Sequence, residues 1–171
     1  MARLRKADQG LIFTSCLFNQ DELALETVQN LWGRRYKLSG KEFPKFNPSL
    51  DYYSKEMGEN LKRVFFWSNE FFEREELIEG KLWSHELEQE FSVDGKRSLN
   101  MDIGVILKEQ VLLATSKPYA HRIYLRKGVW AELTYIYENK SYHFLPWTYP
   151  DYRCSEKIKL FNSLRPGLFS K

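Results

Sequence analysis

Runs of apolar residues in the first half of the chain have the lengths of buried strands. Leu11–Phe18 is a continuous apolar run and Leu61–Trp67 is a second strongly apolar run, and each predicts a strand. After the first run, Asn19 and Glu22 have the spacing of a capping box, and apolar residues at helical spacing extend to Trp32. We therefore predict a strand, a helix and, after an intervening segment, another strand.

The neighbouring segments complete a six-element pattern. Arg34–Phe43 is predicted as an extended polar strand, and the prolines within residues 44–48 mark a loop after it. A helix is predicted from about Phe72 to Phe91, with Gly80 as its weak point, and Leu99–Ile106 is predicted as the next strand. The resulting order, β-α-β-β-α-β, is the order of ferredoxin-like folds.

The last third of the chain has the pattern of antiparallel β-structure. Lys127-Gly128 and Asn139-Lys140 suit two-residue hairpin loops, and a short helix is predicted after about Ser155. We therefore predict one α+β domain over residues 1–171, in which a ferredoxin-like β-α-β-β-α-β N-terminal layer is continued by an antiparallel β-meander. Residues 1–9 are predicted as a loose tail. The meander strands are predicted at Val111–Ser116, His121–Arg126, Val129–Tyr137 and Ser141–Trp147.

The hairpin loops also predict which side chains share a face of the meander. Side chains alternate between the two faces of a strand, and two-residue loops place Ile123 opposite Glu132. On this register His121 and Glu132 become diagonal neighbours on one face. That face would also receive His143 and Trp147, whereas the other would receive Arg122, Tyr124, Tyr135 and Phe144.

Composition and charge narrow the class of protein. Hydrophobic residues make up 43% of the 171 residues and aromatic residues 16%, which excludes a disordered chain. No apolar run approaches the ~18–20 residues that span a membrane. Cys16 and Cys154 cannot form a disulfide scaffold, so we expect reduced thiols and a cytoplasmic location. The net charge is +3, and residues 101–171 carry 11 basic and 6 acidic groups, so a basic surface is expected there.

Glu132 is the residue whose sequence context most favours a functional role. It lies between Ala131 and Leu133 in an apolar strand. Burial of a carboxylate without a partner is costly, so we expect a hydrogen-bond donor beside it. If His121 is that donor, the pair can act as a general acid or base near neutral pH; a purely structural ion pair is the alternative.

Residues with anion-binding or aromatic side chains surround this predicted catalytic pair, His121 and Glu132. Lys117, Arg122 and Arg63 would supply positive charge, and Tyr149 or Trp147 would cover a ligand. The predicted ligand-binding residues are Arg63, Asp102, Lys117, Arg122, Trp147, Tyr149 and Asp151.

A second cluster of polar and aromatic residues comprises Tyr52, Tyr53, Glu56, Lys62 and Arg63. Its basic pair lies at the start of a strand and could bind phosphate or carboxylate; a charged loop is the alternative there.

An ordered set of short motifs resembles one bacterial family over nearly the whole chain, from about Leu11 to Leu168. The motifs are Tyr52–Gly58, Leu61-Lys62-Arg63, Asn100-Met101-Asp102, Leu112–Lys117, His121–Leu125, Trp130-Ala131-Glu132 and Leu145–Tyr152. Together they resemble the domain-of-unknown-function 4416 family. The resemblance implies a shared fold and a shared site, without a known reaction.

Two positions depart from the pattern of that family. Where its members have Pro and then Gly-Tyr after Asp102, this chain has Ile103-Gly104-Val105, and a Thr-Asn of the second helix is Ser84-His85. If relatives bind a ligand there, this chain binds it differently. GTP binding has been attributed to some members of the family.

The sequence lacks the common motifs for nucleotide and metal binding. A phosphate-binding loop needs GxxxxGK[ST], but Gly40-Lys41 is followed by Glu and Gly95-Lys96 by Arg, so Walker-type GTP binding is not expected. A three-ligand metal site would need His121, His143 and Glu132 on one face. Histidines satisfied by hydrogen bonds are the favoured alternative, and no metal is predicted.

These patterns lead to one functional hypothesis with two alternatives. We expect a small soluble bacterial protein with a polar pocket for an anionic ligand, such as a phosphate-bearing small molecule or a nucleotide. One alternative is an RNA- or nucleotide-binding module that uses a β-sheet face, with Lys and Arg around Tyr124, Tyr135 and Tyr142. The other is a structural or assembly protein with an aromatic interface. No membrane partner is expected, and enzymatic activity, cofactor and oligomeric state are left open.

Overall fold

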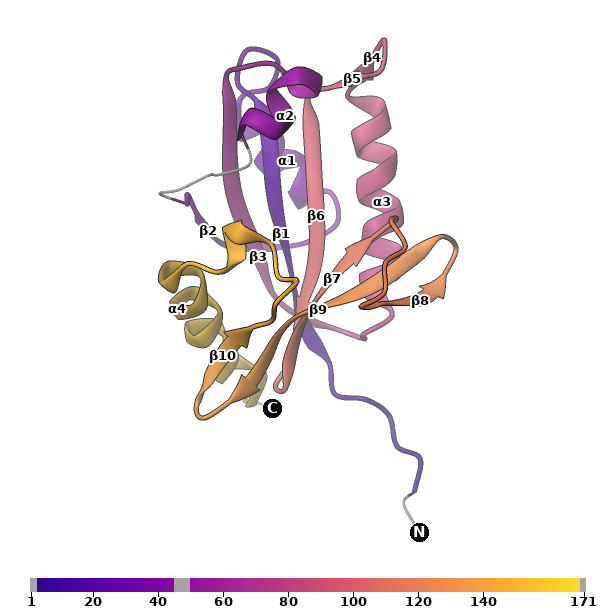
Figure 1. The fold of residues 1–171 in the computed structure, drawn as a ribbon, viewed down its shortest axis with the longest axis vertical. Coiled ribbons are helices and arrows are strands. Elements are labelled where there is room, and N and C mark those ends of the chain that lie inside the picture. The colour runs from indigo at the N-terminus through magenta and orange to yellow at the C-terminus, as the bar shows by residue number, and fades with distance from the viewer. Residues whose placement is uncertain (1–2, 45–49, 170–171) are drawn as a thin grey trace.

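The structure of the protein is a computed structural model that describes residues 3–44 and 50–169. Within these residues eight strands form one sheet and two short strands form a separate ribbon. All strand pairs are antiparallel. The sheet follows the order β10-β9-β7-β6-β1-β3-β2, with β8 paired to β9 beside this path (Figure 1). The mixed α and β class is as predicted, with a mostly antiparallel sheet.

The elements have the following bounds in chain order. The strands are β1 (Gly10–Asn19), β2 (Leu38–Glu42), β3 (Leu61–Phe72), β4 (Ser92–Val93), β5 (Lys96–Arg97), β6 (Leu99–Ile106), β7 (Gln110–Thr115), β8 (Arg122–Arg126), β9 (Val129–Glu138) and β10 (Ser141–Phe144). The helices are α1 (Leu25–Gly33), α2 (Leu50–Met57), α3 (Glu76–Glu90) and α4 (Ser155–Leu164), with 3-10 turns η1 (Pro150–Tyr152) and η2 (Arg165–Phe169).

Strand β1 lies inside the sheet, between β3 and β6. Its residues are buried from Gly10 to Phe18. A strand buried on both faces needs apolar side chains at consecutive positions, which explains the continuous apolar run that predicted it.

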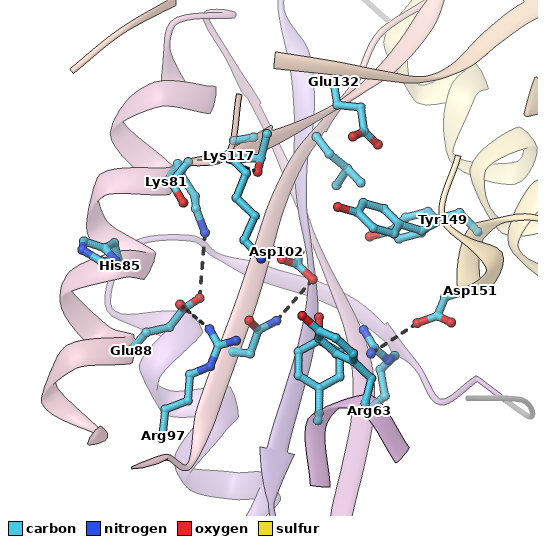
Figure 2. A pocket seen from close by; sticks show the side chains of 18 of the residues that line it. Arg63, Lys81, His85, Glu88, Arg97, Asp102, Lys117, Glu132, Tyr149 and Asp151 are labelled. Carbon is cyan, nitrogen blue, oxygen red and sulfur yellow. Dashed lines mark hydrogen bonds and ion pairs between the residues drawn. The ribbon is translucent and has the colours of Figure 1, made fainter. Parts of the chain in front are cut away.

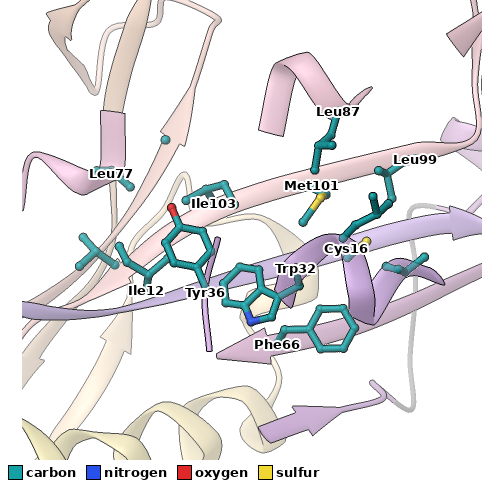
Figure 3. Packing of buried hydrophobic residues seen from close by; sticks show 14 of the residues in the cluster. Ile12, Cys16, Trp32, Tyr36, Phe66, Leu77, Leu87, Leu99, Met101 and Ile103 are labelled. Carbon is teal, nitrogen blue, oxygen red and sulfur yellow. The ribbon is translucent and has the colours of Figure 1, made fainter. Parts of the chain in front are cut away.

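One face of the sheet packs against α1 and α3 (Figure 1). Trp32 at the end of α1 stacks against Tyr36 with ring centroids 4.5 Å apart, and both side chains are almost fully buried. Leu77 and Leu87 of α3 join them above β1 and β6. Figure 3 shows the strand residues that complete this core, among them Ile12, Cys16, Phe66, Leu99, Met101 and Ile103.

Gly80 does not interrupt α3, although it was the predicted weak point of that helix. A Cβ atom at this position would lie 2.5 Å from the hydroxyl oxygen of Tyr36 and 3.1 Å from a methyl carbon of Ile103. The missing side chain therefore lets α3 approach the aromatic core closely, and that packing offsets the low helix propensity of glycine.

The opposite face of the sheet has two apolar patches with a polar strip between them. Tyr152, Phe161 and Leu168, from η1, α4 and η2, cover one end. Met57 of α2 covers the other end, with Tyr53 packed against it. The polar strip arises because each of two neighbouring strands has a polar residue between two apolar ones on this face. In β1 the order is Phe13, Ser15, Leu17, and in β3 it is Phe65, Arg63, Leu61.

The meander contains both hairpins, but one of its registers differs from the prediction. The β9–β10 pairing is as predicted, with Asn139 and Lys140 at positive φ in the turn. In the β8–β9 hairpin the register shifts between Tyr124 and Arg126, which places Arg122 directly opposite Glu132. The predicted pairing of Ile123 with Glu132 is therefore wrong.

A second register shift, between β7 and β9, inverts the predicted grouping of faces further along β9. Leu113 pairs with Glu132, yet Val111 pairs with Tyr135, so Glu132 and Tyr135 share a face. Each extra residue in a strand moves the following side chains to the other face. Arg122, Tyr124, Tyr135 and Phe144 all lie on the face of Glu132, and His143 lies on the other.

Three helices also differ from the sequence prediction. Asn19 caps a single turn, in which its Oδ1 accepts from the Asp21 amide and its carbonyl accepts from the Leu23 amide, both at 2.9 Å. The turn does not continue, and α1 begins at Leu25 with Ala24 as its N-cap. Helix α3 begins at Glu76 because β3 extends further than predicted. Helix α2 was not predicted. The loop predicted over residues 44–48 lies, apart from Pro44, outside the described residues.

Candidate functional site

A polar cavity lies where β6 and β7 diverge. These strands pair only over Gly104–Ile106 and Val111–Leu113, and beyond Gly104 the sheet opens between them. The cavity has a volume of ≈ 200 Å³. Side chains from α2, β3, α3, β6 and β7 line it, together with residues after β7, Glu132 of β9 and the segment Tyr149–Tyr152 (Figure 2). It occupies the polar strip between the two apolar patches.

Glu132 contributes a buried carboxylate to this cavity, and its side chain is only 1% exposed. Its Oε2 accepts a hydrogen bond from Arg122 Nε at 2.8 Å and lies 3.1 Å from His121 Nε2. No described residue donates to Oε1, although this atom is also buried. In Figure 2 the carboxylate projects into the cavity. A buried acceptor without a donor is costly, so Oε1 has capacity for a donor from the cavity.

His121 and Trp147 lie behind Glu132 and do not line the cavity. The two rings stack with centroids 5.0 Å apart and an interplanar angle of 15°. Trp147 is held by a hydrogen bond from its Nε1 to the Leu133 carbonyl at 2.7 Å. His121 therefore contacts Glu132 Oε2 without lining the cavity, as a residue that positions the carboxylate.

Arg122 is buried to 8% exposure of its side chain and is fully engaged with protein groups. Besides Glu132, it donates to the Lys117 carbonyl and to the Tyr149 hydroxyl, both at 2.9 Å. The register shift in β8 makes this possible, since Arg122 was predicted on the opposite face. The guanidinium thus acts as a clamp on Glu132, and its predicted role as an anion-binding group is not what these contacts favour.

Arg63 and Asp151 form a second buried pair at the cavity wall. Arg63 Nη2 lies 3.2 Å from Asp151 Oδ2, and Nη1 donates to Ser15 Oγ at 2.9 Å. The two side chains are 3% and 8% exposed. The pair connects β3 to η1 and so fixes the segment Tyr149–Tyr152 over the sheet.

A third group of charges closes the cavity on the side of α3. Glu88 accepts from the Met101 amide at 2.8 Å, which satisfies a backbone donor on the open edge of β6. Arg97 lies 3.1 Å from Glu88 and 2.9 Å from Glu56 of α2, and Lys81 lies 3.9 Å from Glu88. These contacts hold α2, α3 and β5 around the opening.

Asp102 lies on the floor of the cavity among tyrosine hydroxyls. Its Oδ2 accepts from Asn100 Nδ2 at 3.2 Å, and within the described residues no ion pair to Asp102 is formed. Burial raises the pKa of Tyr53 to about 12, and it also raises the pKa of Tyr149 and of Tyr152. The negative charge of Asp102, which lines the same cavity, adds to the rise in all three.

Lys117 follows β7 and extends into the cavity (Figure 2). Its backbone amide donates to Thr115 Oγ1 at 3.2 Å, which fixes the turn that aims it. In the part of the chain that the structure describes, its ammonium forms no ion pair with a carboxylate. Arg63, Lys81 and Arg97 all have carboxylate partners, so Lys117 is the cavity cation that remains unneutralised there.

The structure brings six of the nine predicted site residues to one cavity. Glu132, Arg63, Asp102, Lys117, Tyr149 and Asp151 line it, whereas His121, Arg122 and Trp147 lie behind Glu132. The second predicted cluster supplies Tyr52, Tyr53 and Glu56, but Lys62 points elsewhere, with its ammonium 4.7 Å from the Phe43 ring centroid.

Several lining residues were not predicted as site residues, among them Lys81, Glu88, Arg97 and Asn100. They come from α3, β5 and β6. The position of His85, also in the lining, had been singled out through the family resemblance.

His143 is remote from the other members of the three-ligand metal site considered from the sequence. It lies on the opposite face from Glu132, and its Nε2 lies 3.0 Å from the Glu138 carbonyl. Among residues 3–44 and 50–169, no group of three or more His, Cys, Asp or Glu side chains could hold a metal ion.

The fold and the cavity define a mixed α/β protein with a polar cavity between diverging antiparallel strands. The chain belongs to the family described as domain of unknown function DUF4416, whose model matches residues 8–167. No curated protein and no solved structure matches the chain. None of the helices within the described residues has the length and apolar character needed to cross a membrane.

Proposed function

We propose that the protein binds a small anionic ligand in the cavity between β6 and β7. The observation that carries this proposal is Lys117, which lines the cavity and whose ammonium forms no ion pair with a carboxylate of the described residues. The cavity also presents Glu132 Oε1, which is buried and has no donor among the described residues. Buried polar groups in proteins are normally satisfied, and here the donor would come from the ligand or from water. Lys117, without an ion pair in the described chain, would hold the anionic group.

The size of the cavity supports a small ligand. Its ≈ 200 Å³ is below the ~300–1,000 Å³ of pockets for drug-sized molecules. A phosphate, a carboxylate or a short phosphorylated metabolite fits this range better than a complete nucleoside triphosphate. Lys117 replaces Arg63 and Arg122 as the main anion-binding group, because both arginines are committed to buried carboxylates.

Titration with inorganic phosphate, followed by NMR of isotope-labelled protein, tests the proposal. Phosphate should cause saturable shifts of the backbone amides of Thr115, Lys117 and Glu132. Lys117→Ala should weaken binding about ten-fold or more. Lys159→Ala is the matched control, since Lys159 is an exposed lysine on α4 that does not line the cavity. Shifts that do not saturate, or that are equal in both variants, would refute the proposal.

RNA binding by a sheet face is the alternative with a partial structural basis. Tyr135 and Tyr142 are buried in the core, so these two rings cannot stack on bases. Tyr124 is 56% exposed beside Ile123, and both belong to β8. The same exposed apolar side chains favour the assembly alternative. RNA affinity that falls steeply with salt would support the first, and a stable oligomer in light scattering would support the second.

A reaction in the cavity would depend on Glu132 rather than on His121. Glu132 Oε1 would be the basic atom that meets a ligand proton, and His121 would position the carboxylate from behind. We further propose a cytoplasmic location, which is supported by the free thiols of Cys16 and Cys154.

We also propose a ferredoxin-like core within the sheet. The strands β1, β2, β3 and β6 would be its four strands, in the spatial order β6-β1-β3-β2, with α1 and α3 as its two helices. Helix α2 would then be an insertion between the second and third strands, and β7 to β10 an extension at the β6 edge. An experimental structure in which β6 does not pair with β1, or β2 does not pair with β3, would contradict the assignment.

A further inference from the structure

We infer that the ligand of the cavity is a small zwitterion, which carries an ammonium or similar nitrogen donor at one end and a phosphate or carboxylate at the other. This inference rests on the proposed function and adds a requirement to it. A ligand that is only an anion would bind Lys117, and it would leave the Oε1 atom of Glu132 without a donor and the charge of Asp102 without a counter-charge among the described residues.

The first carboxylate is Glu132, which needs a donor on its cavity side. Arg122 and His121 both contact Oε2, and neither contacts Oε1. Carboxylates accept several hydrogen bonds, and a side chain that is 1% exposed cannot obtain them from bulk water. An N–H donor inside the cavity would therefore complete the coordination of this group.

The second carboxylate is Asp102, which adds negative charge to the floor of the same cavity. It accepts only the Asn100 amide among the hydrogen bonds found in the described chain. The groups around it are the neutral hydroxyls of Tyr53, Tyr149 and Tyr152, whose pKa values its charge helps to raise. A positively charged ligand group between Asp102 and Glu132 would be stabilised by both.

The balance of the remaining charges also supports a zwitterion. Arg63 is neutralised by Asp151, Arg122 by Glu132, and Arg97 with Lys81 faces Glu56 and Glu88. Among the described residues of the cavity wall, one ammonium, Lys117, and one carboxylate, Asp102, remain without an ion pair, and Glu132 Oε1 remains without a donor. A ligand with both signs of charge complements this set, whereas a simple anion or a simple cation complements only part of it.

Matched probe pairs test the inference by NMR titration. The first pair is phosphoethanolamine and inorganic phosphate, and the second is β-alanine and propionate. In each pair the zwitterion has the ammonium that its partner lacks. We expect at least one zwitterion to bind about ten-fold or more tightly than its partner, the factor of one charge-assisted hydrogen bond. The pair that responds identifies the anionic group as phosphate or carboxylate.

Variants locate the source of that preference. Asp102→Asn and Glu132→Gln should each remove most of the preference for the zwitterion, while the affinity for the simple anion stays the same or rises, because a carboxylate that repels it has been removed. Glu138→Gln is the control, because Glu138 is an exposed residue at the end of the same strand. Asp102→Asn retains an acceptor for Asn100, so it keeps the test valid if Glu132→Gln fails to fold.

The outcomes separate this inference from the proposed function. Equal affinities within both pairs, with Lys117-dependent anion binding intact, would overturn the zwitterion and leave the proposed function standing. A preference that persists in Asp102→Asn and Glu132→Gln would also overturn it. No saturable binding of any of the four probes would count against both proposals.

Discussion

The ion pair between Arg122 and Glu132 offers the sharpest prediction about stability. Both side chains are buried, at 8% and 1% exposure, and Arg122 also donates to the Lys117 carbonyl and the Tyr149 hydroxyl. Arg122→Met would leave a buried carboxylate with His121 as its only side-chain partner. Breaking a buried pair in this way costs about 3–5 kcal/mol, which corresponds to a fall in Tm of roughly 6–20 °C for a chain of this length.

Thermal and urea unfolding of the two single variants and the double variant measures this cost. Arg122→Met and Glu132→Leu should each be strongly destabilising, but the double variant should lose much less than the sum, because an apolar pair replaces the ion pair without a stranded charge. Arg126→Met is the control on the same strand. Its pair with Glu79 is 2.6 Å long, yet the two side chains are 50% and 36% exposed, so a loss of at most about 1 kcal/mol is expected.

Additive losses of unfolding free energy in the two single variants would refute the expected dependence of Arg122 and Glu132 on each other. If the double variant loses the sum of the single losses within about 0.5 kcal/mol, the two groups do not depend on each other. A loss for Arg122→Met as small as that for Arg126→Met would have the same meaning.

Three further predictions concern the core, the thiols and a buried lysine. Gly80→Ala should destabilise by about 1–3 kcal/mol because the new methyl group meets the Tyr36 hydroxyl; unfolding that shows a gain of about 1 kcal/mol, as in an exposed helix, would contradict this. Cys16 is fully buried and burial raises the pKa of its thiol, so a thiol reagent should modify Cys154 first and Cys16 only on unfolding; equal rates would contradict this. Burial lowers the pKa of Lys157 in the folded protein below 10.5, its value in the unfolded chain. Between these two pKa values the unfolded chain binds more protons at this lysine than the folded protein does, so the stability of the folded protein rises with pH in that window. The wild-type protein should therefore gain stability relative to Lys157→Met as the pH rises towards 10.5, and a relative loss would contradict the argument.

Much of the fold could be predicted because buried strands leave short segments that are rich in apolar residues. Leu11–Phe18, Leu61–Trp67 and Leu99–Ile106 all lie within observed strands. Helix α2 (Leu50–Met57) escaped prediction because it is only eight residues long and follows the two prolines that mark a loop. The start of α1 was misplaced because Asn19 caps a single turn that ends before Leu25, so its capping signal belongs to that turn and not to the helix.

The candidate site was predicted partly for the wrong reason. The expected contact between His121 and Glu132 exists at 3.1 Å, but His121 precedes β8 and does not lie in the ladder. The predicted grouping of side chains on the two faces of the meander was wrong because two register shifts, each the result of one extra residue, moved side chains from one face to the other. No local feature of the sequence marks those residues. The contributions of α3 and β5 also depend on tertiary placement, which spacing along the chain does not reveal.

The most direct test of the account is a high-resolution crystal structure of the protein purified without added ligand and then soaked with phosphoethanolamine. We predict an ordered ligand between β6 and β7, with its nitrogen within hydrogen-bond distance of Glu132 Oε1 and its phosphate beside Lys117. A structure in which a protein group donates to Glu132 Oε1, and in which the cavity is closed or holds no ordered ligand, would contradict the account.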